Sequence, residues 1–375
     1  MSLYEEARAL ARQYIDPYAK EMDEKKRFPV ELFEELKKTD LLKLIIPKDQ
    51  GGLGGGLLEH EEVCRAFAQS SASAGLCYMM HNVALNAILK KGNDKLKEEV
   101  CKDVCENGAF TGLAFSEFGY GTNFIYSTLD VKNDGDQVII DGRKSMVTSA
   151  THATYYLVLT PSSTGEGIET YIVKKDDPGV TFEMDEWDGL GMRGNVSCPM
   201  TMKNVTLTKT DRLVGEPGKG MDVSSNHVSP MFVTGLAGVY SGLCQHILEV
   251  ITNWSLNRKF PDGRALCNLD TVQIHLAEAY TLTNASVAAA QRAARSGDAG
   301  EPDALLKILA GRIMAARSAI QVANLAMQIG GGKIYNKSTC IEQLLRDAYA
   351  GQIMAPSVDV LLLWLARGMT GQELH

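Results

Sequence analysis

The hydrophobic periodicity of this chain changes twice along its length, and these changes constrain the fold more than any other feature. Residues 1–108 carry apolar side chains three and four positions apart, for instance at 31–44 and 58–67, which is typical of amphipathic helices. Helical patterns return at 219–375, where apolar residues between Leu305 and Ile329 form a broad stripe. Between these two parts, short β-branched runs alternate with turn residues, at 138–140, 155–160, 171–173 and 200–207.

This pattern predicts an α+β protein of several domains. We expect an N-terminal helical domain at 1–108, a middle β-barrel or β-sandwich domain at 109–218, and a C-terminal four-helix bundle at 219–375. A length of 375 residues agrees with this division, because a single hydrophobic core stops growing at roughly 250 to 300 residues. No βαβ alternation accompanies the strands, so a dinucleotide-binding fold of the Rossmann kind is disfavoured.

Charge and apolar run length exclude two classes of partner. The net charge of −8 gives no overall basic surface, so we do not expect the protein to bind nucleic acid. The apolar run at 358–366 is far shorter than the roughly 20 residues that span a bilayer, and the N-terminal segment is charged where a signal peptide is apolar. We therefore expect a cytoplasmic protein with no membrane partner.

The cysteines do not indicate a disulfide framework or a metal site. Eight of them are scattered along the chain without a CxxC pair, which indicates reduced thiols. Cys101 and Cys105 would share one helical face, but no histidine or third cysteine near them in sequence completes a set of metal ligands. We predict no metal, and buried small apolar side chains are the simpler interpretation of these two residues.

Two short segments indicate a shelf for a flat cofactor. Residues 112–123 read GLAFSEFGYGTN between strand-like runs, and 141–150 read DGRKSMVTSA after an Asp-Gly turn. Glycines let the backbone approach a ligand closely, so donors near Ser116 and Thr148 are candidates for contact with such a cofactor. A tight loop that simply needs glycines is the alternative interpretation.

The two segments resemble the flavin-contacting segments of the acyl-CoA dehydrogenase family. The loop is similar to AxTEPxAGSD, with Phe118 in place of Pro, and 142–148 is similar to GxKxWIT, with Met146 in place of Trp. Residues 189–195, GLGMRGN, resemble the family's LGxRG turn, which we interpret as architectural. The resemblance implies the acyl-CoA dehydrogenase fold, FAD as cofactor, and contacts to the flavin or the acyl thioester from Phe115, Ser116, Gly121, Thr122, Met146, Val147 and Thr148.

Motifs in the C-terminal part extend the resemblance. The run at 258–260 resembles RxxF, whose Arg pairs with the pyrophosphate of the flavin dinucleotide through a planar guanidinium. The run at 328–332 is similar to QIxGGxG, although a helix C-cap that needs glycine is compatible with the same residues. In the family, the second motif binds the dinucleotide of a neighbouring subunit, so we expect a homo-oligomer, a dimer or a tetramer. The residues implied by these two motifs are Arg258, Phe260, Gln328, Gly331 and Gly332.

The catalytic base of the family is missing from its usual position. The family's Glu stands in a Tyr-Glu-Gly-Thr run after Arg-Asp-Ala, but here the aligned run is Met-Ala-Pro-Ser at 354–357, and Ala355 cannot accept a proton. Some relatives place the Glu at the start of the first C-terminal helix, where 229–233 read SPMFV. Ser357 and Asp359 match polar positions that the resemblance assigns to the adenosine half of the cofactor, and helical spacing turns Asp359 away from position 355. The catalytic residues are therefore unassigned.

Three functional hypotheses follow. The resemblance implies an FAD enzyme of fatty acid metabolism that oxidises or reduces an acyl thioester at the α,β carbon–carbon bond, with CoA or a carrier protein as the handle and an electron-transfer protein as a candidate partner. The second hypothesis is a flavin-dependent monooxygenase on the same scaffold, which needs no carboxylate base. The third is a catalytically silent subunit that binds flavin or an acyl carrier.

Overall fold

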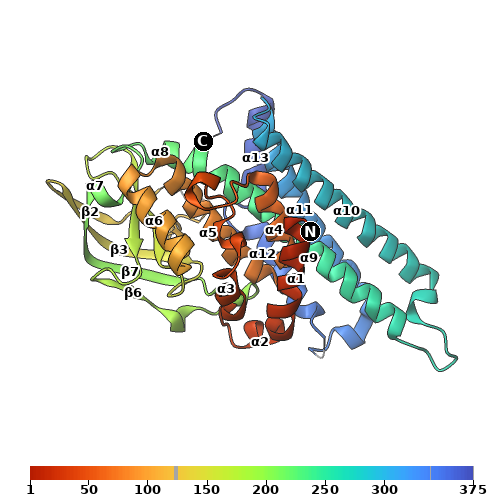
Figure 1. The fold of residues 1–375 in the computed structure, drawn as a ribbon. Coiled ribbons are helices and arrows are strands. Elements are labelled where there is room, and N and C mark those ends of the chain that lie inside the picture. The colour runs from red at the N-terminus through yellow and green to blue at the C-terminus, as the bar shows by residue number, and fades with distance from the viewer. Residues whose placement is uncertain (122–125, 338, 375) are drawn as a thin grey trace.

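The order of the three parts is confirmed by a computed structural model, which describes residues 1–121, 126–337 and 339–374. Figure 1 shows the β domain at one end, the N-terminal helices at the centre, and the long C-terminal helices extending to the other end. One continuous hydrophobic core runs through all three parts. The cofactor shelf predicted from the sequence therefore belongs to a molecule whose parts are packed together.

The N-terminal part consists of helices, and three of them begin at polar side-chain caps. Ser2 and Glu5 form a reciprocal capping box on the first helix, Ser71 caps the fifth, and Asn93 caps the sixth, so donors that helix ends leave unpaired are satisfied. The fifth helix is buried along most of its length and forms the centre of the molecule. The helices are α1 (Leu3–Tyr14), α2 (Ala19–Glu24), α3 (Val30–Leu36), α4 (Leu57–Ala68), α5 (Ala72–Lys91) and α6 (Asp94–Asn107).

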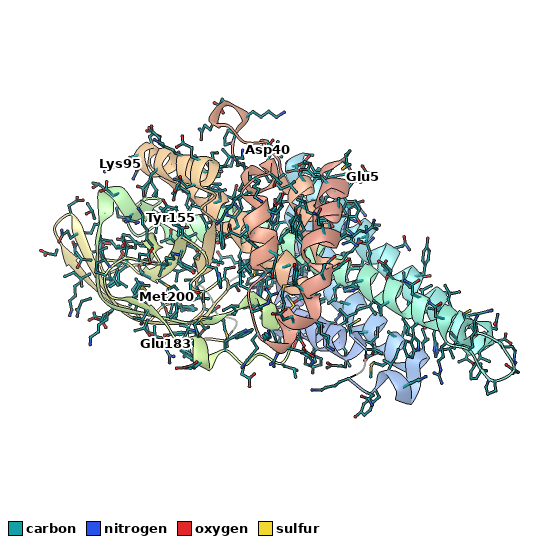
Figure 2. The ribbon with its side chains drawn as sticks, turned by 60° about the horizontal axis from the view of Figure 1, so that its bottom comes forward. Glu5, Asp40, Lys95, Tyr155, Glu183 and Met200 are labelled. Carbon is teal, nitrogen blue, oxygen red and sulfur yellow. The ribbon has the colours of Figure 1, made fainter. Side chains whose placement is uncertain are left out.

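The middle part contains two four-stranded sheets. One has the strand order β1-β4-β5-β8, with β1 parallel to β4, and the other has the order β2-β3-β7-β6 and is antiparallel throughout. In Figure 2, Tyr155 and Met200 lie within this domain, and both side chains are buried. The strands are β1 (Thr111–Ala114), β2 (Asp130–Asp134), β3 (Gln137–Val147), β4 (Tyr155–Pro161), β5 (Ile168–Lys174), β6 (Val180–Phe182), β7 (Cys198–Thr208) and β8 (Leu213–Val214).

The C-terminal part is a bundle of long helices. Its apolar stripe, predicted from the periodicity between Leu305 and Ile329, lies within one helix of the bundle. Two short helices connect the β domain to the bundle, and a π-helix, Ser224–Val228, precedes its first long helix. The connecting helices are α7 (Lys209–Arg212) and α8 (Gly220–Val223), and the bundle contains α9 (Ser229–Asn257), α10 (Asp270–Asp298), α11 (Ala304–Ile334), α12 (Ile341–Ile353) and α13 (Val358–Met369).

One helical stretch of the described residues, Gly220–Asn257, is long and apolar enough to cross a membrane. Its most apolar 18-residue window has a mean hydropathy of 1.3, and 83% of that window is buried inside the protein. The bent pair α12 and α13 passes the same test when the two helices are taken together. Burial of the first stretch is the pattern of a core helix in a bundle.

The cysteines are all unpaired. Cys101 lies in α6 with its Sγ 3.4 Å from Oε1 of Gln50, and Cys105 has its Sγ 3.7 Å from the backbone oxygen of the same residue. Within the three described ranges, His, Cys, Asp and Glu side chains form no group of three that could hold a metal ion.

Candidate active site

A cavity of about 600 Å³ opens between the β domain and the C-terminal helices. Its lining is mostly apolar and aromatic, with a few polar groups, which is the composition of a small-molecule site. All three parts of the chain contribute, because Met80 comes from the central helix α5. The other lining residues used below are Phe115, Ser116, Glu117, Phe118, Gly119, Gly121, Ser145, Met146, Thr148, Leu190, Gly191, Met192, Asn195, Ser197, Phe232, Arg346, Tyr349, Met354, Ala355 and Pro356.

The loop after β1 forms one wall of this cavity. Phe115 is buried, and the backbone oxygen of Ser116 accepts a hydrogen bond of 2.8 Å from the backbone N–H of Ser145 in β3. Gly119 and Gly121 have positive φ angles of 95° and 55°, a conformation that favours glycine. The predicted residue Thr122 lies outside the described residues. Phe115, Ser116 and Gly121 therefore line one cavity.

The end of β3 forms the adjoining wall. Alternation along the strand leaves Met146 exposed in the cavity, whereas Val147 is fully buried in the core and does not contribute to the described lining. Thr148 is buried in the wall, and its Oγ1 lies 2.8 Å from Oγ of Ser197. Met146 and Thr148 thus share the cavity with the loop after β1.

Strained backbone is concentrated next to this wall. Ser149, Met192 and Val196 have φ angles of 61°, 54° and 48°, in the left-handed region that non-glycine residues seldom adopt, and a β-branched residue such as Val196 is especially unfavourable there. The backbone N–H of Ser149 donates to the oxygen of Asn195 at 2.9 Å, which ties the two strained segments together. Such strain costs on the order of 1–3 kcal/mol per residue and is found mostly at functional sites.

Asn195 brings an unsatisfied polar atom to the cavity. Its side chain is buried, yet Oδ1 has no hydrogen-bond partner among the described residues. A buried polar group normally has a partner, because leaving it unpaired costs about 1–3 kcal/mol. This atom is a candidate acceptor for a donor on a bound ligand.

A buried ion pair supports the loop after β1. Nζ of Lys144 lies 2.6 Å from Oε1 of Glu117, and both side chains are almost fully buried. Burial lowers the pKa of Lys144 to about 8, against the opposing effect of Glu117. Burial acts to raise the pKa of Glu117, but the Lys144 ammonium and hydrogen bonds from Ser127 and Thr128 outweigh it, so this pKa lies below its ordinary value. Both groups are therefore charged at neutral pH.

The titratable side chains of the described lining are Glu117, Arg346 and Tyr349. Glu117 is paired with Lys144, and Arg346 forms a bidentate ion pair with Asp23 of α2, at 3.0 and 2.6 Å. Ala355, at the position where the base was expected, lies in the wall between Met354 and Pro356. The described lining therefore offers no unpaired carboxylate.

Other predicted residues lie in a second group, at the far end of the bundle. Nη1 of Arg258 donates to the backbone oxygen of Gly330 at 3.3 Å, and its guanidinium lies over the ring of Phe260. Gly331 interrupts α11 with φ 60° and ψ −156°. In Figure 1 the hairpin between α9 and α10 projects away from the β domain. None of Arg258, Phe260, Gln328, Gly331 and Gly332 belongs to the described lining of the cavity.

Ser357 and Asp359 belong to neither group. The hydroxyl of Ser357 caps α13 by accepting from the backbone N–H of Val360, and Asp359 is exposed in the first turn of the same helix. Serine is a common N-cap residue, and an acidic residue in the first turn interacts favourably with the helix dipole. Both residues therefore have an ordinary structural role at the start of α13. The role that the resemblance assigns to these two side chains stays a prediction.

Several residues of the site were not identified from the sequence. The ion pair of Lys144 and Glu117 joins residues 27 positions apart, and no local pattern indicates it. Phe232 and Tyr349 are also part of the lining. Helical periodicity distinguishes only a buried face from an exposed one, so it does not indicate that either residue lines a cavity. Asn195 belongs to the turn that we interpreted as architectural, and the structure places it in the cavity wall.

Asp347, next to the cavity, predicts a specific dependence of stability on pH. Its Oδ1 accepts a hydrogen bond of 2.5 Å from the backbone N–H of Met192, and burial raises its pKa to about 7. Between about pH 4 and pH 7 the folded protein keeps this proton while the unfolded chain releases it, so rising pH destabilises the fold by up to about 1 kcal/mol per pH unit. We expect Asp347→Asn, which keeps the acceptor, to lose this slope. Urea unfolding of both proteins across this range measures it, and a pH-independent difference between them would contradict the prediction.

Comparison with known proteins reveals relatives along the whole chain. Family models described as the N-terminal, middle and C-terminal domains of acyl-CoA dehydrogenase match residues 1–108, 112–205 and 219–370. A probable acyl-CoA dehydrogenase from Mycobacterium tuberculosis is 29% identical over 368 residues, covering 96% of this chain and 93% of the relative. A 3-(aryl)acrylate reductase from Clostridium sporogenes is 30% identical over 367 residues, covering 97% and 96%. The solved structure of butyryl-CoA dehydrogenase from Megasphaera elsdenii superimposes with a TM-score of 0.90 at 21% identity, covering 99% and 98%.

Proposed function

This chain belongs to the acyl-CoA dehydrogenase family, a family of flavin-dependent oxidoreductases, and from that premise we propose that it acts on the α,β carbon–carbon bond of an acyl thioester with FAD as cofactor. The observation that carries the proposal is the cavity between the β domain and the bundle, where Phe115, Ser116 and Thr148 meet a largely apolar chamber. The handle of the thioester is CoA or a carrier protein.

The residues present fit a flavin ring. A flat, largely apolar heterocycle with polar edges needs apolar faces and a few hydrogen-bonding groups, and the cavity supplies Met146 and Phe115 for the first and Thr148 for the second. The unpaired Oδ1 of Asn195 is an acceptor that a ring N–H would satisfy. We propose that these residues hold the cofactor together with Ser116, Gly121 and Thr122. When bound, the flavin supplies hydride exchange with the β carbon of the acyl group.

The proton chemistry of the site favours reduction of an unsaturated acyl group. Removing a proton from the α carbon requires a positioned base, and Ala355 supplies none. Glu117, the carboxylate of the described lining, is held by Lys144. In the reductive direction the α carbon instead receives a proton, which water can donate. The Clostridium relative carries the name of a reductase, which supports the same direction.

A flavin-dependent monooxygenase is the second candidate function. Such a reaction removes no α proton, so the same lack of an unpaired carboxylate in the described lining supports it. The cavity wall at 115–121 and 146–148, which matches the acyl-CoA dehydrogenase segments, supports the first candidate more strongly.

The second group of predicted residues supports a homo-oligomer. We propose that Arg258, Phe260 and the glycines of α11 contact the dinucleotide of a neighbouring subunit, because they lie outside the described lining of their own cavity. Arg258 and Phe260 belong to the connection between α9 and α10, and this hairpin projects away from the β domain (Figure 1). Large apolar side chains on this part are exposed, and exposed apolar patches are typical of protein interfaces. They include Leu256, Ile274, Tyr280 and Tyr335.

Flavin spectra under anaerobic conditions test the proposed function. The FAD-loaded protein is reduced with dithionite and then mixed with crotonyl-CoA, and we expect the visible absorbance of oxidised flavin to return without oxygen. Butyryl-CoA added to the oxidised protein should bleach the flavin far more slowly, because the base is missing. Return of the absorbance only after oxygen is admitted would favour the monooxygenase and contradict the proposal.

A further inference from the structure

The ion pair between Lys144 and Glu117 is an unusual feature of the β domain. The Lys144 side chain has an exposed fraction of 0% and that of Glu117 has 2%. Removing two charges from water costs several kcal/mol per ion, and an apolar pair of similar volume is often as stable. Apolar side chains of similar size could therefore supply most of the stability that the pair contributes. The other contacts of the pair indicate which part of the chain it positions.

These contacts fix the base of the loop after β1. Nζ of Lys144 also donates to the backbone oxygen of Phe115 at 3.3 Å. The Glu117 carboxylate accepts from the hydroxyl of Ser127 and from both the backbone N–H and the hydroxyl of Thr128, the last two at 2.7 Å. One carboxylate thus joins the residues that follow β1 to the residues that precede β2.

The loop that this pair closes contributes to the cavity. Its described residues Phe118, Gly119 and Gly121 belong to the lining, and Phe115 and Ser116 immediately precede it. The neighbouring residue of Lys144, Ser145, donates its backbone N–H to the oxygen of Ser116. The backbone oxygens of Phe115 and Ser116 are therefore held by two consecutive residues of β3, Lys144 and Ser145.

We propose that the buried Lys144–Glu117 pair is an electrostatic clamp that positions the 115–121 wall to receive the cofactor. Lys144 and Glu117 are positioning residues, since they act on the ligand through the backbone that they hold. The inference rests on the proposed function for the identity of the ligand, FAD, but the closing of the loop is a property of the chain alone. The charges matter more than the size of the side chains, because one ammonium and one carboxylate satisfy an acceptor that follows β1 and donors that precede β2.

Proteolysis of the apo-protein tests the clamp without any cofactor. Chymotrypsin cleaves after aromatic residues, and the loop presents Phe118, Tyr120 and Tyr126. We expect Lys144→Met or Glu117→Gln to accelerate cleavage in this loop by about tenfold or more, since each leaves a buried charge unpaired. The double variant Glu117→Gln/Lys144→Met should be cleaved more slowly than either single variant. Lys132→Met is the matched control, because it removes an exposed ion pair with Asp130 on β2, and it should be cleaved like the wild type.

Affinity for FAD is the second measurement, followed by quenching of flavin fluorescence. We expect each single variant to bind FAD about tenfold or more weakly than the wild type, the double variant to recover part of this loss, and Lys132→Met to bind normally. If a single variant fails to fold, Thr128→Val, which removes one side-chain hydrogen bond to Glu117, takes its place with an effect of about fivefold in both assays.

The outcomes separate the clamp from the function. Folded single variants that are cleaved and bind FAD like the wild type would overturn the clamp. Accelerated cleavage in a protein whose wild type binds no FAD would support the clamp and overturn the proposed function. A double variant that is cleaved faster than both single variants would also overturn the clamp. The loss of pairing between the two charges would then not explain the faster cleavage of the single variants.

Discussion

Replacing Ala355 with glutamate is expected to give the protein the ability to remove a proton from the α carbon of a saturated acyl-CoA. Ala355 lies in the cavity wall between Met354 and Pro356, at the position where the sequence resemblance places the base. Apolar neighbours raise the pKa of a carboxyl group, which makes a glutamate there a better base near neutral pH. A positioned base contributes about 100-fold or more to the rate of proton transfer. Exchange of the α protons of butyryl-CoA with deuterated water, followed by NMR, measures the effect.

Ala355→Gln is the control for this experiment. Glutamine has nearly the same size as glutamate but cannot accept the proton, so it isolates the base from the change in cavity shape. We expect Ala355→Gln to exchange the α protons at the wild-type rate, and Ala355→Glu to bleach the flavin with butyryl-CoA anaerobically. Equal exchange rates in the two variants would mean that position 355 does not face the α carbon, and the proposed placement of the acyl group would be wrong.

The arrangement of domains could be predicted because it depends on local periodicity. The strand expected at 155–160 is β4, Tyr155–Pro161, and the helix expected at 58–67 is α4, Leu57–Ala68, since a short run of strand-forming residues and helical spacing are each visible within a few residues. The segment 31–44 is less regular than its periodicity indicates. It contains α3, Val30–Leu36, and a separate 3-10 helix at Asp40–Lys43, because a turn at 37–39 interrupts the helix.

The site could be predicted only where its residues are neighbours in sequence. Ser116 and Thr148 belong to short motifs, and a backbone hydrogen bond from Ser145 to Ser116 joins the two segments at the cavity. The partners of Glu117 and Arg346 depend on contacts across the fold. Arg346 reaches Asp23 over 323 positions, and no local pattern indicates that distance. Likewise, Asn195 was interpreted as part of a turn, because an unpaired side-chain atom can be recognised only when its surroundings are known.

Substituting Gly191 with alanine is expected to destabilise the protein by about 3 kcal/mol and to weaken FAD binding strongly. A Cβ at this position would lie 2.4 Å from the backbone carbon and oxygen of Arg346 and 2.7 Å from the backbone nitrogen of Asp347. These are backbone atoms of α12, so no side-chain rotation relieves the clash. The cavity wall at 189–192 would have to separate from α12. Urea unfolding of the apo-protein measures the stability, and quenching of flavin fluorescence measures the affinity.

Gly332→Ala is the matched control for stability, because a Cβ there meets no atom of the described residues within 4 Å and its φ is not in the left-handed region. Alanine favours a helix over glycine by up to about 1 kcal/mol, so this variant should be as stable as the wild type or slightly more stable.

In Gly191→Ala, separation of the wall from α12 would also break two hydrogen bonds between the same segments, from Arg346 to the backbone oxygen of Leu190 and from the backbone N–H of Met192 to Asp347. The decrease in the free energy of unfolding of Gly191→Ala should therefore exceed the decrease caused by removing either hydrogen bond alone. If Gly191→Ala had the same unfolding midpoint as the wild type, the wall at 189–192 and α12 would not meet as closely as described.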